Sequence, residues 1–510
     1  MLRMPSRFHA VLNFQALIRS LPFAGRSPRV HLALLFALGQ FLLYFSFPNT
    51  WFQIPVAAFF AFVPLLLILS RATFWVRILW AWAYFQLFFF LMFKMNPFEN
   101  WQRFGSPSVV VAFVAFFILF PICYAAFLLL FHQIAARTRF APLICGAVWA
   151  IFEYLLTIIP IGFPLSFGIT QYQSPFFLSI ARYFGIGGIS LTLVALNVAL
   201  FQLIFLRKND YPTWKWTSLV VCCALIGASL LPWLPDSQTQ PRTQTPPPMR
   251  TGPTLILVQP NLSWRDAFRS HSNAFFYQDQ VKTLTDLLAQ IPDVSGNTLV
   301  FPEWTLAHFD PTDPVLKARF LPLISQSSQV IIGSQRGSQP VTLHYFPQAH
   351  ERTRAISKFN RVPFFESTAL SPPPGQPLTL DKAGHILQIR LCFETLYPKA
   401  LHYPIHSKAI LGGLSFNTWL GNTNWPILHM SYFPIRAAES GVGGFFLNNN
   451  GPSIVVDSRG KIISQLPLGQ SGWIRYHPLF DSRPTGVGAL KFQLTPIPIN
   501  RYYRGGRIYE

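Results

Sequence analysis

Charged residues are scarce in this sequence, and acidic residues are the scarcest. Asp, Glu, Lys and Arg make up 12% of the 510 residues, about half of the share that a soluble protein usually has. The chain has 19 acidic residues against 40 Lys and Arg, so its net charge is +21. The basic residues of the first half flank apolar runs and form no polar face. We therefore predict attraction to anionic membrane lipid and no binding of nucleic acid.

Cysteine is also rare, with five residues in the chain. Cys123, Cys145, Cys222 and Cys223 lie in apolar runs, where a buried and unreactive thiol is the ordinary expectation. Cys392 is the only cysteine of the polar half, so that half can form no internal disulfide bond. No set of Cys and His residues around it has the spacing of a metal site. We expect no metal and no other cofactor, and a lone cysteine is more often inert than catalytic.

Long apolar runs fill the first half of the chain. A bilayer crossing needs about 20 such residues, and seven runs come near that length after a basic N-terminal segment over residues 1–29. They lie near residues 30–48, 51–70, 74–95, 107–131, 141–163, 180–206 and 216–234. We predict a membrane domain of seven transmembrane helices over residues 30–234. The basic segment has no long apolar core, so it is not interpreted as a cleavable signal.

Two features inside these runs have competing interpretations. Glu153 lies in the fifth run, where it either hydrogen-bonds to neighbouring helices or makes a polar contact inside a lipid cavity. The stretch Gly185-Ile186-Gly187-Gly188 lies in the sixth run. Small residues there allow helices to approach closely, so this stretch is not interpreted as a phosphate-binding loop.

The basic residues around the runs are distributed unevenly. The loops after the second, fourth and sixth runs carry Arg71, Arg137, Arg139, Arg207, Lys208 and Lys215. The intervening loops carry little more than Arg103, with Lys94 and Arg182 at their edges. Because basic loops remain in the cytoplasm, we predict a cytoplasmic N-terminus. Seven crossings then place everything after Leu234 on the outer face of the membrane.

The second half has a different organisation. A polar, proline-rich linker over residues 235–253 precedes a domain over residues 254–480, and a polar tail covers residues 481–510. Short β-rich runs alternate with one clear helical run over residues 274–290. The predicted strands are 254–259, 298–301, 330–333, 355–359, 386–391 and 409–415. Some strands follow each other without a helix, so we predict an α/β sandwich with mixed sheets.

Three residues with complementary chemistry stand at or just past the ends of predicted strands: Glu303, Lys358 and Cys392. A thiol reacts as its thiolate, so it needs a nearby base, and Glu303 could accept the proton. A lysine ammonium can stabilise the oxyanion that forms in acyl transfer. The alternatives are a solvated carboxylate, a surface lysine and an inert thiol. Spacing alone does not decide between these interpretations.

Sequence motifs favour the catalytic interpretation. FPEWT, SKFNRVPFFE and LCFETLYP resemble, in order, the three signature regions of the nitrilase (carbon-nitrogen hydrolase) superfamily. VQPNLSW, SFNTWLG, RAAESG and NNNGPSIVVDSRGKII add weaker matches, as do GFPLSFGITQYQSP and FGIGGISLTLVALN in the membrane half. Together with the preceding apolar runs, the sequence resembles the apolipoprotein N-acyltransferases, the membrane-anchored branch of that superfamily, over nearly its whole length.

This resemblance implies a nitrilase-like α-β-β-α sandwich as the catalytic domain and a role for each matching residue. Glu303 is expected to act as general base, Lys358 as oxyanion stabiliser and Cys392 as nucleophile. The supporting positions are Glu366, which assists the site, Phe393 and Glu394, which follow the cysteine, and Trp264, which contacts substrate.

The implied reaction has two steps and two lipid partners. Cys392 takes a fatty acyl chain from a phospholipid as a thioester, and the N-terminal amine of a lipoprotein's diacylglyceryl-cysteine then accepts it. Three alternatives remain. One is a divergent membrane-tethered nitrilase-like amidase or acyltransferase with another acceptor. Another is a conjugation-associated nitrilase-like protein. The third is an assembly factor that kept the fold without the activity.

The sequence departs from the family pattern at four places. Phe365 replaces a usual Gly, and Phe416 and Asn417 replace a usual Asn-Asp pair. Leu165 stands where an aromatic residue is expected. Residues 480–510 are polar, where the family normally has another membrane span. These departures leave Glu303, Lys358 and Cys392 intact and bear mainly on the identity of the acyl acceptor.

Overall fold

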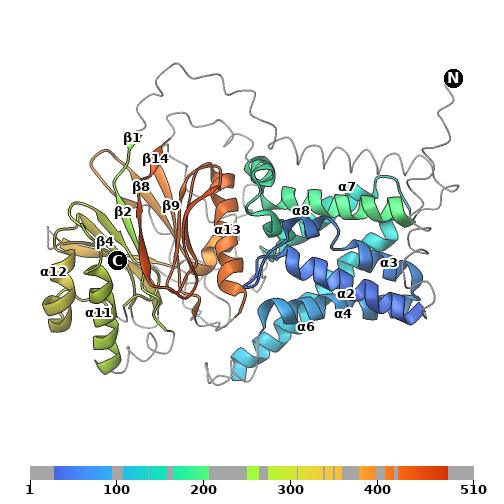
Figure 1. The fold of residues 1–510 in the computed structure, drawn as a ribbon, viewed down its shortest axis with the longest axis horizontal. Helices are drawn as coiled ribbons and strands as arrows, with labels where there is room; N and C mark the ends of the chain where they lie inside the picture. The colour runs from blue at the N-terminus through green and yellow to red at the C-terminus, as the bar shows by residue number, and fades with distance from the viewer. Residues whose placement is uncertain are drawn as a thin grey trace, which may run out of the picture.

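The protein consists of a helical bundle followed by a sandwich of two β-sheets (Figure 1). The computed structural model describes residues 28–94, 107–135, 137–157, 165–205, 250–263, 274–306, 308–336, 339–347, 351–358, 378–397, 408–418 and 423–480. The predicted N-terminal segment, the seventh apolar run, the linker and the C-terminal tail lie outside these residues, apart from the ends of two of them.

The bundle contains six α-helices in the described part of the chain: α2 (Pro28–Ser46), α3 (Val63–Arg71), α4 (Phe74–Phe93), α6 (Pro107–Ala135), α7 (Ala141–Leu156) and α8 (Pro175–Phe205). Two short 3₁₀ helices, η2 (Pro55–Phe59) and η3 (Phe167–Gln171), lie between them. Within the described residues, three helical stretches are long and apolar enough to cross a membrane: Phe74–Phe93, Phe117–Ala135 and Pro175–Ile204. The prediction of seven crossings therefore stays a prediction.

The second apolar run does not form one continuous helix. Residues 51–54 are irregular, η2 begins at Pro55, and a separate α-helix begins at Val63. Proline lacks an N–H and is tolerated in the first turn of a helix but not in its interior. Pro55 and Pro64 each occupy such a first-turn position, so the run that we predicted as one span is divided into two short helices.

The sixth run also differs from the prediction. Helix α8 begins at Pro175, earlier than expected, and Gly185 has φ +68° and ψ −176° inside it. A residue without a Cβ adopts this conformation at little cost. Gly185 thus divides α8 into two segments, and the backbone N–H of Ile186 is at the start of the second one.

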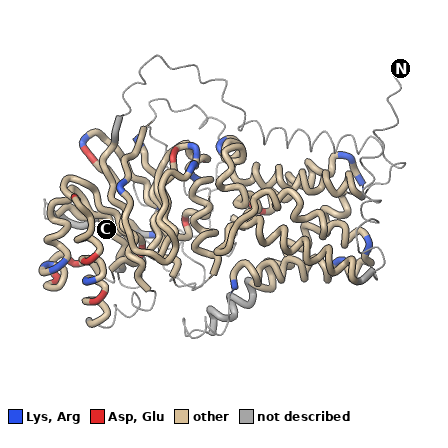
Figure 2. The backbone as a smooth tube through the Cα atoms, viewed as in Figure 1, with Lys and Arg blue, Asp and Glu red and all other residues tan. Residues whose placement is uncertain are grey.

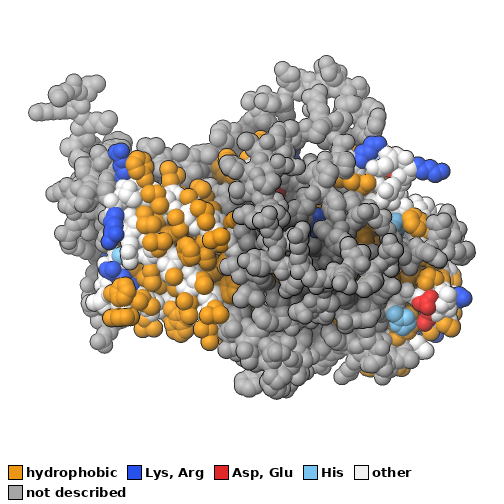
Figure 3. All heavy atoms as spheres, turned by 180° about the vertical axis from the view of Figure 1, so that it is seen from behind, with side chains coloured by type: hydrophobic (Ala, Val, Ile, Leu, Met, Phe, Trp, Pro, Cys, Tyr) orange, Lys and Arg blue, Asp and Glu red, His pale blue; other side chains and the backbone are white. Residues whose placement is uncertain are grey.

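The outer surface of the bundle is apolar. Figure 3 shows hydrophobic side chains over the visible described face of the bundle, and Trp75 is 77% exposed. Charged residues are nearly absent between the two ends of the bundle (Figure 2). A surface of this extent is unfavourable in water and favourable in lipid, so the bundle has the character of a membrane domain.

Two six-stranded sheets form the rest of the fold. The first has the order β13-β2-β3-β4-β5-β6 and the second has the order β12-β11-β10-β9-β8-β7. Their strands are β2 (Leu255–Gln259), β3 (Thr298–Val300), β4 (Gln329–Arg336), β5 (Gln339–Phe346), β6 (Glu351–Ser357), β7 (Leu378–Thr379), β8 (Ile386–Leu391), β9 (Ala409–Ser415), β10 (Gly444–Asn448), β11 (Ser453–Val456), β12 (Ile462–Leu466) and β13 (Gly472–Tyr476). Strands β1 (Arg250–Thr251) and β14 (Leu479–Phe480) form a separate pair.

Both sheets are mixed, as predicted. In the first sheet, β2, β3 and β4 are parallel, whereas β4, β5 and β6 are antiparallel. In the second, β8, β9 and β10 are parallel. The carboxyl ends of parallel strands lie at one edge of a sheet, where loops present functional groups. The sandwich therefore positions the ends of β3 and β8 for function.

Three buried clusters define the layers. One lies between the first sheet and helices α11 (Ala274–Leu288) and α12 (Leu321–Ile324), and a second lies between the two sheets. The third joins the second sheet and α13 (Trp425–Ser440) to the membrane helices as a single core. The order helix, sheet, sheet, helix agrees with the expected sandwich. Helix α13 lies between the sheets and the bundle (Figure 1).

Candidate active site

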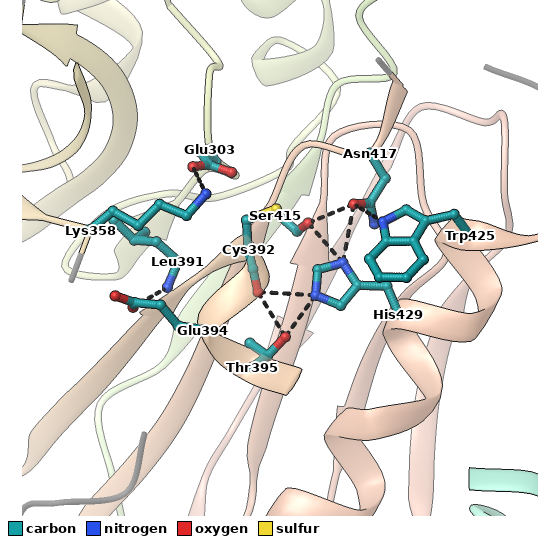
Figure 4. A network of polar contacts seen from close by, with 10 residues as sticks. All are labelled: Glu303, Lys358, Leu391, Cys392, Glu394, Thr395, Ser415, Asn417, Trp425 and His429. Carbon is teal, nitrogen blue, oxygen red and sulfur yellow. Dashed lines mark hydrogen bonds and ion pairs between the residues drawn. The ribbon is translucent and has the colours of Figure 1, made fainter. Parts of the chain in front are cut away.

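The three predicted reactive residues each follow a strand. Glu303 follows β3, Lys358 follows β6, and Cys392 follows β8 of the facing sheet. Their side chains are buried, with Glu303 and Lys358 3% exposed and Cys392 4% exposed. Lys358 Nζ lies 3.4 Å from Glu303 Oε1. Figure 4 shows the Lys358 ammonium directed toward the Glu303 carboxylate, with Cys392 near this pair.

Cys392 occupies an unusual backbone position. Its φ is +44°, a region that residues with a Cβ rarely adopt and that often accompanies function. It begins the 3₁₀ helix η6 (Cys392–Leu396) immediately after β8. Glu394 Oε2 accepts a hydrogen bond from the Leu391 backbone N–H at 2.9 Å. Glu394 therefore fixes the turn that presents the sulfur.

The loop that carries Glu303 lies directly against strand β4. A Cβ on Gly333 would lie 2.2 Å from the Pro302 carbonyl oxygen and 2.5 Å from the Glu303 Cα. The Leu306 N–H donates to the Gly333 carbonyl at 3.1 Å. Trp304, next to Glu303, has φ +59°. Glycine at residue 333 is therefore required for this close approach.

His429, from α13, is a neighbour of Cys392 that the sequence did not indicate. Its Nε2 lies 3.0 Å from the Cys392 carbonyl oxygen and 2.7 Å from Thr395 Oγ1. Its Nδ1 lies 3.1 Å from Asn417 Oδ1, which also accepts a hydrogen bond from Trp425 Nε1 at 3.2 Å (Figure 4). The only sequence signal was helical spacing: residues 429, 432, 436 and 439 share one face of a helix.

Burial keeps His429 uncharged. It lowers the pKa of the imidazole to about 3, with the Cys392 carbonyl opposing the shift and the Lys358 charge adding to it. Asn417 is neutral, where the family pattern has Asp, so no carboxylate from that position favours an imidazolium.

The remaining predicted positions are placed as follows. Phe393 is buried in the core shared with the membrane helices, and its ring lies 5.3 Å from that of Tyr397. Phe416 is buried and stacks on Trp304 with ring centroids 5.9 Å apart. Trp264, Glu366 and Phe365 lie outside the described residues. Among the residues that the structure describes, no group of three or more His, Cys, Asp or Glu could hold a metal ion.

The apolar bundle and the two-sheet domain together have the character of a membrane protein with an α-β-β-α sandwich domain. A family model described as the apolipoprotein N-acyltransferase N-terminal domain matches residues 39–199. The resemblance that we predicted from the sequence is thus confirmed, and it continues into the second half in comparisons with whole proteins.

The relatives are named apolipoprotein N-acyltransferase. The protein from Haemophilus ducreyi is 24% identical over 409 residues, which cover 72% of this chain and 75% of the relative. The protein from Geobacter metallireducens is 23% identical over 475 residues, which cover 86% of this chain and 87% of the relative. That from Pseudomonas aeruginosa is 32% identical over 103 residues, 20% of each chain.

Part of the chain is similar to solved structures of an amidase and of a CN-hydrolase superfamily protein. An amidase from Nesterenkonia sp. has a TM-score of 0.34 at 15% identity, covering 46% of this chain and 94% of that chain. A superfamily protein from Xanthomonas campestris has a TM-score of 0.33 at 14% identity, covering 45% of this chain and 91% of that chain.

Proposed function

We propose that the protein transfers a fatty acyl chain from a phospholipid, through a thioester on Cys392, to the N-terminal amine of diacylglyceryl-cysteine on lipoproteins. The observation that carries this proposal is the buried ion pair of Glu303 and Lys358 beside the Cys392 turn, in a domain whose core continues into apolar membrane helices. The names of the relatives agree with an N-acyltransferase. Glu303, Lys358 and Cys392 are the proposed catalytic residues.

The first step forms the thioester. Glu303 accepts the Cys392 thiol proton while the sulfur attacks the ester carbonyl carbon of the phospholipid. The Lys358 ammonium stabilises the resulting oxyanion. As the tetrahedral intermediate collapses, the ester C–O bond breaks and Glu303 returns the proton to the departing alkoxide. A lysophospholipid leaves, and the acyl chain remains on the sulfur.

The second step forms the amide. The α-amine of the acceptor attacks the thioester carbonyl, and Glu303 accepts a proton from the amine. The C–S bond breaks, the thiolate of Cys392 leaves, and the proton returns to it. The enzyme is regenerated without a cofactor. Water must be excluded from the thioester, since hydrolysis would turn the reaction into phospholipid cleavage.

Four further residues have proposed supporting roles. Glu394 holds the nucleophile turn through the Leu391 N–H, and Phe393 anchors that turn in the shared core. Glu366 is proposed to assist the site as a second carboxylate, and Trp264 to contact substrate. The roles of these last two are carried over from the family pattern.

The proposed location is the bacterial inner membrane, with the sandwich in the periplasm. Figure 2 shows Lys and Arg at the end of the bundle away from the sheets. Arg71 ends α3, and Arg137 and Arg139 lie between α6 and α7. Basic residues favour the cytoplasmic side. This orientation places Cys392 at the outer leaflet, where both lipid substrates would be anchored.

Mass spectrometry of the intact protein tests the first step. Purified protein in bilayers of a phospholipid with one defined acyl chain should gain the mass of that chain. The adduct should map to Cys392, be released by hydroxylamine, and be absent from Cys392→Ala. Addition of a diacylglyceryl-cysteine peptide should then discharge it and acylate the peptide. A wild-type protein that gains no adduct from any supplied phospholipid would contradict the proposal.

A second candidate keeps the first step and changes the acceptor. It is favoured by the stacked pair Trp304 and Phe416, because Phe416 stands where the family pattern has a polar Asn. A bulky apolar side chain there alters the surroundings of Glu303. Offering the acylated protein a panel of amines distinguishes the candidates: discharge by a simple amine, but not by the lipopeptide, would favour a different acceptor.

A further inference from the structure

One face of α13 connects the Cys392 turn to the membrane bundle. His429, Tyr432, Arg436 and Glu439 are spaced by three, four and three residues, which places them along one side of a helix. Two of them contact the turn and two contact the bundle. Along α13 the residues that contact the turn alternate with those that contact the bundle. The turn and the bundle are therefore each bound at two separate places on the helix.

The turn is held at both ends. His429 Nε2 lies 3.0 Å from the carbonyl of Cys392, where η6 begins. Arg436 donates from Nε to the Thr395 carbonyl at 3.2 Å and from the second guanidinium nitrogen to the Leu396 carbonyl at 2.6 Å. The last carbonyls of a helix have no partner within that helix, and Arg436 supplies one to η6.

The bundle is also held at two points. Tyr432 Oη accepts a hydrogen bond from the Ser166 N–H at 3.1 Å. Glu439 Oε1 accepts one from the Ile186 N–H at 2.8 Å. The break at Gly185 exposes that N–H at the start of a helical segment, where a carboxylate is favourable.

Arg436 and Glu439 join the two sets of contacts. They form an ion pair in which the Arg436 side chain is 4% exposed and that of Glu439 is 10% exposed. Burying two charges is costly, and removing one partner costs more than the pair contributes. The Arg436–Glu439 ion pair therefore contributes little to the free energy of unfolding. The two paired side chains connect the Ile186 N–H, which Glu439 binds, to the carbonyls of η6, which Arg436 binds.

We propose that Arg436 and Glu439 are positioning residues that set the location of the Cys392 turn relative to the break in membrane helix α8. The consequence for the reaction rests on the proposed function: the sulfur would be held at a fixed depth relative to phospholipid ester groups. A nucleophile that attacks a membrane-bound ester must lie at the depth of the ester groups in the bilayer, and this registration matters because small displacements of reacting atoms strongly lower reaction rates.

Hydrogen exchange of backbone amides tests the coupling in the full-length protein. Glu439→Ala should accelerate exchange of the Ile186 amide and also of residues 391–397, which Glu439 does not touch, by about tenfold for loss of a charged hydrogen bond. Arg436→Lys should accelerate exchange at Ile186, because coupling is reciprocal. Glu439→Gln keeps an oxygen for Ile186 and should loosen residues 391–397 alone. Ser440→Ala is the matched control, since its hydroxyl bonds to the Ala437 carbonyl and the Val442 N–H and to neither η6 nor α8.

A reaction assay tests the registration. Glu439→Ala should lower the rate of Cys392 acylation by bilayer phospholipid about tenfold and change alkylation by iodoacetamide much less, because a soluble reagent requires no alignment with the membrane. Exchange that rises at Ile186 but stays unchanged over residues 391–397 would overturn the coupling. Equal losses with both reagents would overturn the registration. A wild-type protein that no phospholipid acylates would contradict the proposed function, and the exchange results would still decide the coupling.

Discussion

The imidazole of His429 contacts the backbone of the proposed nucleophile: Nε2 lies 3.0 Å from the Cys392 carbonyl oxygen. Because Cys392 has φ +44°, its turn is strained and needs support from its surroundings. His429→Gln should shift the turn while leaving the triad residues unchanged. We expect a tenfold or greater loss of thioester formation, about the effect of one lost hydrogen bond to a buried group. Acylation of Cys392 by phospholipid measures it, and a rate equal to wild type would show that the contact does not support the turn.

The neutral state of His429 predicts a pH dependence of stability. Burial lowers its pKa to about 3 in the folded protein, against an ordinary value of 6.5 for an imidazole. Between these values the unfolded chain binds the proton and the folded chain does not, so stability falls as pH decreases from 6.5 toward 3. His429→Asn should reduce this slope, whereas His477→Asn, at an exposed position, should not. Thermal unfolding from pH 7 to 4.5 measures it, and equal slopes in all three proteins would contradict the prediction.

The contact between Asn417 and His429 leads to a prediction about the charge of the imidazole. Asn417→Asp would place a carboxylate 3.1 Å from His429 Nδ1, which favours the imidazolium and raises the pKa of His429. A charged imidazole next to Lys358 is unfavourable, so thioester formation should become dependent on pH near neutrality. The pH profile of Cys392 acylation should therefore differ between the variant and wild type. Identical profiles would show that Asn417 does not control the charge of His429.

The ion pair of Glu303 and Lys358 predicts a characteristic set of variants. Lys358→Met removes the cation 3.4 Å from a buried carboxylate, and breaking a buried pair costs about 3–5 kcal/mol. Acylation should fall by about 10²–10³-fold through loss of oxyanion stabilisation. The double variant with Glu303→Gln removes both charges and should recover stability but no activity. Denaturant unfolding and intact-mass assays measure the two effects. Recovery of activity in the double variant would exclude Glu303 as the base.

We expect a substitution at Gly333 to lower both the stability of the protein and the rate of Cys392 acylation. Alanine would place its Cβ 2.2 Å from the Pro302 carbonyl oxygen, so the loop that carries Glu303 must move. Overpacking of this kind typically costs about 1–3 kcal/mol. Ser334→Ala is the matched control, because the Ser334 hydroxyl has no hydrogen-bond partner among the described residues. We expect slower acylation only in Gly333→Ala, and a wild-type rate there would show that the loop tolerates the change.

The sequence predicted the sandwich well because its strands are buried runs with clear boundaries. The runs at 254–259, 386–391 and 409–415 became β2, β8 and β9 nearly residue for residue. Strand β5 was missed because its sequence, QPVTLHYF, contains a proline and polar residues that do not alternate clearly. Helix α13 was missed because Pro434 lies inside it and because nearly its whole length is buried, which removes the amphipathic pattern.

The sequence predicted only those residues of the candidate site that lie in the family motifs. The residue types of Glu303, Lys358 and Cys392 follow from strand ends and family motifs, and their catalytic roles stay predictions. His429, Arg436 and Glu439 contact backbone groups of other elements that lie 37 to 253 positions away in the sequence. No local sequence pattern encodes contacts over such separations. The break at Gly185 could not be predicted from the sequence either, because a glycine in an apolar run is equally typical of a close contact between helices.

Glu153 offers a last prediction, in the membrane bundle. Its carboxylate accepts hydrogen bonds of 2.6 Å from Trp149 Nε1, Ser166 Oγ, Ser190 Oγ and the Phe167 N–H, which agrees with the first of its two interpretations. Two of these partners, Trp149 Nε1 and the Phe167 N–H, can only donate. Glu153→Leu would leave both without their acceptor, and an unsatisfied buried polar group costs about 1–3 kcal/mol.

The effect of this variant should extend to the sandwich. Ser166 and Phe167 lie in the segment whose Ser166 N–H donates to Tyr432 of α13, so loosening it removes one contact between bundle and sandwich. We expect a lower thermal unfolding temperature in detergent and faster amide exchange over residues 165–171. Glu439→Ala provides the comparison, since it removes the other contact, from the Ile186 N–H. Unchanged exchange over residues 165–171 in Glu153→Leu would show that the carboxylate is not what holds this segment.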